Sequence, residues 1–82
     1  MNAADRQIAV RVYACLNTMS GLRPINPANI AVTSQSLKVI DSAIRDLMPA
    51  LDHLIHGEHE AAAEYLDDAE RLLALEQERR QR

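Results

Sequence analysis

The chain has 82 residues, a net charge of -3 at neutral pH, two glycines, one cysteine and no tryptophan or phenylalanine. This length supports a single domain over residues 1–82 with one small core, and the lone cysteine excludes a disulfide within the chain. Charged residues interrupt every apolar stretch well before the about 20 residues that a membrane span requires. We therefore expect a soluble, cytoplasmic protein that does not insert into a membrane.

Apolar residues recur at helical spacing along the whole chain, and no stretch shows the two-residue alternation of a strand. The pattern predicts an all-α fold, a small three-helix bundle. Asn2 is the expected cap of the first helix, and Thr33 or Ser34 of the second. The expected segments, in chain order, are a helix at about 3–20, a Pro/Asn loop at about 21–33, a helix at about 34–56, a helix at about 58–79 and a frayed basic tail at 80–82.

The first helix has an apolar arc that is wider than one stripe. Its main face consists of Ile8, Val12, Cys15, Leu16 and Met19. Ala9 and Tyr13 extend this face, so we expect the helix to be covered on two sides. Cys15 lies in an apolar stretch and is interpreted as a core residue.

The second helix carries a seam of apolar residues at alternating steps of three and four. This seam consists of Leu37, Ile40, Ile44, Leu47, Leu51 and Leu54. We interpret it as a candidate self-association surface and expect a homodimer. Pro49 lies within the seam, so the helix either kinks there or restarts with Pro49 in its first turn. Leu51 and Leu54 keep the phase of the preceding residues, which favours the kink.

Gly57 is the natural end of the second helix, and the short connection predicts an antiparallel hairpin with the third. The third helix has an inner face formed by Ala62, Tyr65, Leu66, Ala69, Leu72 and Leu73. The stretch from Gly57 through Ala62 to Ala69 resembles the turn and second helix of a tetratricopeptide repeat, with these three residues on the small-residue positions. The chain has no second copy of the pattern, so the resemblance implies a tight helical hairpin and not membership of that family.

Acidic residues dominate the hairpin, since residues 46–70 contain no lysine or arginine. We interpret five of them as a candidate face for docking a protein with a basic surface: Asp52, Glu60, Glu64, Asp67 and Asp68. The predicted function is a non-enzymatic protein–protein interaction module, such as an adaptor, regulator or inhibitor. An alternative is a nucleic-acid-mimicking or phage-type inhibitor of a host complex. Direct nucleic-acid binding is not expected, because these carboxylates would repel phosphates.

Three histidines, His53, His56 and His59, cluster around Gly57 and suggest a second alternative, a metal-binding protein. Their spacing matches no zinc-hydrolase motif, and Gly57 interrupts the helix between the second and the third. We expect no physiological metal, no cofactor and no catalytic residue, because the sequence has neither a phosphate-binding glycine loop nor a recognisable acid–base constellation.

Overall fold

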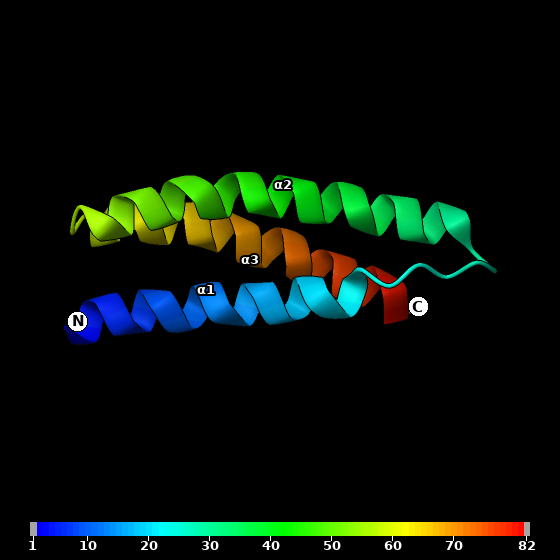
Figure 1. Cartoon of the computed structure of the whole chain (residues 1–82), viewed down its shortest axis with the longest axis horizontal. Coiled ribbons are helices and arrows are strands. Elements are labelled where there is room, and N and C mark those ends of the chain that lie inside the picture. The colour runs from blue at the N-terminus through cyan, green and yellow to red at the C-terminus, as the bar shows by residue number, and fades with distance from the viewer. Residues whose placement is uncertain (1, 82) are drawn as a thin grey trace.

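The computed structural model describes residues 2–81 and consists of three helices. Helix α1 spans Ala3–Leu22, α2 spans Ile30–Ile55 and α3 spans His59–Gln81. They pack into a bundle of 45 × 18 × 17 Å, with α3 running behind α1 and α2 in Figure 1. The described residues contain no strand, so the predicted all-α bundle is confirmed. None of these helices is both long and apolar enough to cross a membrane.

The core is a line of aliphatic side chains along the bundle axis, with alanines where helices approach most closely. From α1 come Ile8, Val12, Cys15, Met19 and Leu22, from α2 Ile40, Ala43, Leu47 and Ala50, and from α3 Ala62, Leu66, Ala69 and Leu73. Helices α2 and α3 share the largest contact, whereas α1 and α2 share the smallest. Burial raises the pKa of the Cys15 thiol, as expected for a core cysteine.

Asparagine side chains cap the first two helices. Asn2 accepts a hydrogen bond from the Asp5 amide at 2.8 Å, as the sequence predicts. Asn29 accepts one from the Val32 amide at 3.1 Å, so α2 begins four residues earlier than expected. Thr33, the expected cap, is instead buried in the first turn, where its hydroxyl donates to the Asn29 carbonyl oxygen and accepts from the Asn26 amide.

The connection between α1 and α2 is correspondingly short. Helix α1 continues through Gly21 to Leu22, so the loop occupies residues 23–29 and not 21–33. Ile25 and Ile30 are exposed and do not cover the end of the bundle. The hydrogen bonds that Asn29 and Thr33 form thus order the start of α2.

Helix α2 is continuous through Pro49, which lies inside it. The alternative in which the helix restarts at Pro49 is therefore wrong, while the predicted kink stays a prediction. Pro49 is compatible with an uninterrupted helix because its cost, about 3 kcal/mol in an isolated helix, is offset by the long packed contact with α3.

Gly57 ends α2 in a left-handed conformation with φ of 73°. The Gly57 amide donates to the Leu54 carbonyl oxygen at 3.0 Å and the Glu58 amide to the His53 carbonyl oxygen at 2.9 Å. These two bonds are the Schellman arrangement, which glycine adopts without steric cost. After this turn, α3 runs back alongside α2 (Figure 1).

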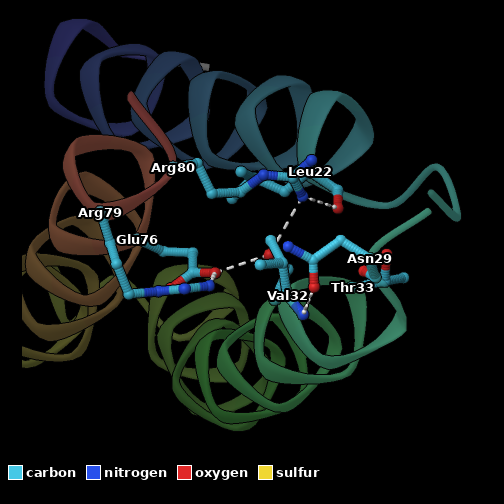
Figure 2. Close-up of polar contacts among 8 residues, drawn as sticks. Leu22, Asn29, Val32, Thr33, Glu76, Arg79 and Arg80 are labelled. Carbon is cyan, nitrogen blue, oxygen red and sulfur yellow. Dashed lines mark hydrogen bonds and ion pairs between the residues drawn. The ribbon is translucent and has the colours of Figure 1, made fainter. Parts of the chain in front are cut away.

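A buried polar network joins the three helices at the end opposite the Gly57 turn (Figure 2). Glu76 of α3 is 3% exposed, and its carboxylate accepts the Ser36 hydroxyl at 2.6 Å and the Arg79 Nε at 2.8 Å. Arg80 donates to the Ser36 hydroxyl oxygen and to the Leu22 carbonyl oxygen, both at 3.1 Å. Arg79, with support from Ser36, lowers the pKa of Glu76, so this buried group stays ionised.

This network differs from the tail that the sequence predicts. Helix α3 continues to Gln81, and Arg80 bridges to α1 and α2 where fraying is expected for residues 80–82. Position 82 lies outside the described residues. Because Arg80 donates to the Leu22 carbonyl oxygen, it satisfies an acceptor at the end of α1, whose last turn has no basic residue of its own.

Replacement of Glu76 with alanine should lower the free energy of unfolding by about 2–3 kcal/mol, because it leaves the buried Ser36 hydroxyl without its acceptor. Urea denaturation followed by circular dichroism measures this change. The control is Gln77→Ala, an exposed position on the same turn, which should shift stability by less than about 0.5 kcal/mol. Equal values for the two variants would show that the network adds nothing to stability.

Candidate functional site

Four of the five candidate acidic residues share the outer face of α3. Glu60, Glu64, Asp67 and Asp68 follow one another at steps of four, three and one, which places them on one side of a helix. The fifth, Asp52, belongs to α2 and lies seven residues after Arg45. The side of α2 that contacts α3 is a different one, so the structure does not bring Asp52 into this face.

Two residue pairs between α2 and α3 identify the side of α2 that faces α3. The ring of His53 stacks on Tyr65 with centroids 5.7 Å apart, and Asp46 lies beside Asp68. His53 and Asp46 are seven residues apart and therefore on one line of α2. Asp52 is on neither this line nor the buried one.

Asp67 and Asp68 are engaged in ion pairs within the chain. The Arg11 guanidinium of α1 donates to Asp67 at 2.6 Å and to both carboxylate oxygens of Glu70, at 2.7 and 3.0 Å. Arg71 pairs with Asp68. The Glu70 carboxylate, followed by Asp67, raises the pKa of Arg11 above its usual value. The sequence does not predict these ion pairs of Arg11, because Asp67 and Glu70 are 56 and 59 positions away along the chain.

Glu60 and Glu64 are exposed, and neither forms an ion pair within residues 2–81. They border a shallow depression that also includes Gly57, Glu58 and His59 at the start of α3. Two like charges four residues apart repel each other by a few tenths of a kcal/mol on a helix surface. These two carboxylates are therefore the part of the predicted acidic face that remains available.

Asp46 and Asp68 form an acidic pair between α2 and α3. Burial, followed by the hydrogen bond and charge of Asp68, raises the pKa of Asp46 to about 6. The pKa of Asp68 is lowered by its hydrogen bonds to Asp46 and Arg71. The Oδ2 atom of Asp46 is buried without a hydrogen-bond partner among the described residues. The pair thus holds one proton more readily than two isolated aspartates would.

The three histidines do not converge on a common point. His53 contacts Glu58 at 3.1 Å, His56 contacts the Asp52 carbonyl oxygen at 2.7 Å, and His59 pairs with Asp5 of α1. The contact with the Asp52 carbonyl raises the pKa of His56. Within residues 2–81, no group of three His, Cys, Asp or Glu side chains is placed to hold a metal ion.

The predicted self-association seam divides into two lines. Ile40 and Leu47 are buried in the bundle and Leu54 packs against it, so these three residues cannot form a free surface. Leu37, Ile44 and Leu51 remain more than 40% exposed. The division follows from helix geometry, because steps of three and four spread the seam over an arc, and a neighbouring helix covers only one edge of it.

Helix α1 also exposes part of its apolar arc. Tyr13 is 66% exposed and Leu16 50%, so the expectation that α1 is covered on two sides is not met within this chain. The sequence therefore specifies more apolar surface on α1 and α2 than the three helices bury.

A scan against models of protein families, a search of curated proteins and a search of solved structures each found no match to this chain.

Replacement of Asp46 with asparagine should stabilise the protein at neutral pH. The raised pKa means that the folded state binds the Asp46 proton more tightly than the unfolded state does. Ionisation of Asp46 therefore lowers the free energy of unfolding as pH rises from about 4 through about 6. We expect a gain of about 1 kcal/mol at pH 7.5 and no gain near pH 3.5. Thermal unfolding at a series of pH values measures it, with the exposed Asp41→Asn as control. A gain that does not vary with pH would contradict the shared-proton interpretation.

Proposed function

We propose that this chain is a non-enzymatic protein–protein interaction module, an adaptor, regulator or inhibitor, that docks a basic surface of another protein on the outer face of α3. The observation that carries the proposal is the state of Glu60 and Glu64. Neighbouring acids on α3 are matched by Arg11 or Arg71, whereas these two are exposed and have no cationic partner among residues 2–81. A negative patch of this kind increases the rate of encounter with a positively charged partner.

The local structure supports docking at this position. The left-handed Gly57 turn and the Schellman hydrogen bonds hold the start of α3, and the pair between His59 and Asp5 attaches it to α1. The Glu60 and Glu64 carboxylates are thus presented from a fixed helix and not from a loop, which reduces the entropy lost on binding. The ion pairs of Arg11 and Arg71 with other acids also reduce competition from cations of the same chain.

The double variant Glu60→Gln, Glu64→Gln should weaken binding of the natural partner by about tenfold or more, because it removes two charges from the docking face. Affinity purification with mass spectrometry first identifies the partner, and its Kd for each variant is then measured with purified proteins. Asp67 and Asp68 are left unchanged, since their replacement would also break the pairs with Arg11 and Arg71.

The matched control is Asn17→Lys with Gln35→Lys, which changes net charge by the same amount at exposed positions of α1 and α2. Its affinity should stay within about twofold of wild type, because it leaves the α3 face intact. An equal loss of affinity in both variants would show that the effect comes from net charge alone. No loss of affinity in either variant would refute the docking face. Competition by nucleic acid for the same partner surface would favour the nucleic-acid-mimicking alternative.

A further inference from the structure

Helix α2 exposes large apolar side chains along most of its length, and α1 exposes several near its middle. On α2 these are Leu37, Ile44, Met48, Leu51 and Ile55, which are between 41% and 79% exposed, and Ile30 at the start of the helix, which is 60% exposed. On α1 they are Tyr13 and Leu16, at 66% and 50%, together with Val10, at 59%, which lies farther round the helix and outside this set. Isolated apolar side chains are ordinary on a protein surface, but a continuous row of them marks an interaction site.

Both sets lie on the face of the bundle that α3 does not cover. Asp46 and His53 lie on the side of α2 that contacts α3, and Arg11 lies on the side of α1 that contacts α3. Each exposed row lies on the opposite flank of its helix from those contacts. In Figure 1 α3 runs behind α1 and α2, so it does not cover the near side of these two helices.

The exposed row on α2 has the spacing of a coiled-coil seam. Positions 37, 44 and 51 are separated by seven residues, and positions 41, 48 and 55 continue the same row at steps of four and three. Asp41 is the polar member of the row between Leu37 and Ile55. Its carboxylate forms an ion pair with the Arg45 guanidinium at 3.0 Å. A helix with this row is suited to pack against another helix in addition to α1 and α3.

We propose that the occupant of this face is a second copy of the chain, whose α2 lies antiparallel to α2 of the first and fits between its α1 and α2. With the twofold axis near position 46, Ile44 of one copy meets Met48 of the other, and Leu37 meets Ile55. The five residues from Leu37 to Ile55 then all face the row of the second copy, with Leu51 opposite Asp41. The surface is complementary to itself, as a twofold dimer requires.

The charges at the edge of the row disfavour a shift toward the start of the helix. Lys38, Arg45 and Asp52 are seven residues apart and form the outer edge of α2, next to the apolar row. In the proposed register Lys38 lies opposite Asp52 of the second copy, and the reverse, so two attractive pairs flank the row, while Arg45 lies opposite Arg45 of the second copy. A shift by one heptad toward the start of the helix places Lys38 opposite Arg45 of the second copy, which is repulsive.

The extent of the face is adequate for a dimer. Five α2 residues and two α1 residues, each roughly half exposed, present apolar surface on the order of 700 Å² per copy, against the roughly 800 Å² per partner of a stable interface. The wide apolar arc of α1, which the isolated bundle leaves open at Tyr13 and Leu16, is covered by α2 of the second copy. This interface lies across the bundle from Glu60 and Glu64, so it is independent of the proposed docking face.

Sedimentation equilibrium at about 50 µM tests the dimer, since the chain has a mass of 9.2 kDa. We expect twice that mass for the wild type and a single-chain mass for Met48→Glu, a 66% exposed position. The Glu60→Gln, Glu64→Gln variant should remain dimeric, which separates this test from that of the docking face. A wild type that is monomeric at this concentration would overturn the proposal and assign the face to another protein.

Disulfide trapping tests the orientation, even if Met48→Glu fails to fold. In the antiparallel register, position 45 lies near the twofold axis, whereas position 38 is about 24 Å along the helix from its counterpart. Arg45→Cys should therefore give a crosslinked dimer on mild oxidation, and Lys38→Cys should not; Cys15 is buried in both variants. Crosslinking of both positions would indicate a parallel pair, and crosslinking of neither would exclude this interface.

Discussion

The buried carboxylate of Glu76 is the constraint on which the arrangement of the three helices depends. An ionised group at 3% exposure is tolerated only if hydrogen bonds replace its water, and Ser36 and Arg79 supply them. Arg80 then extends the network to the Leu22 carbonyl oxygen of α1. Aliphatic helices can slide past one another at small cost, whereas this network is satisfied in one register only. The position of the apolar and acidic faces follows from that register.

The fold class and most of the core could be predicted from the sequence, because helical periodicity reports which side of each helix is buried. Cys15 and the Gly57 turn are examples, since each depends on neighbouring residues alone. Glu76 could not be recognised, because its burial is set by Ser36, 40 residues away, and because a glutamate in a charged tail resembles a solvated one. The start of α2 was misplaced for a similar reason: Asn29 and Thr33 are both good caps, and tertiary burial of Thr33 decides between them.

For the candidate surfaces too, the sequence predicts what lies on one helix but not how two helices are placed relative to each other. The four acids of α3 share a face because they share a helix, but Asp52 required the relative placement of two helices. The seam on α2 was correctly identified as apolar, yet only packing against α1 and α3 distinguishes Ile40 and Leu47 from Leu37, Ile44 and Leu51. The result is a molecule with acidic residues on one side and exposed aliphatic residues on the other.

The order of the chain gives the Glu76 network a consequence for synthesis. Ser36 precedes Arg80 by 44 residues, which a ribosome adds in about 2 to 9 seconds. Once Ile55 has been added, α1 and α2 are complete, but Glu76 and Arg80 do not yet exist, and the contact between α1 and α2 is the smallest in the bundle. The nascent chain therefore carries two loosely associated amphipathic helices with their apolar sides open, a state in which a chaperone or another nascent copy finds the same residues that later line the finished surface.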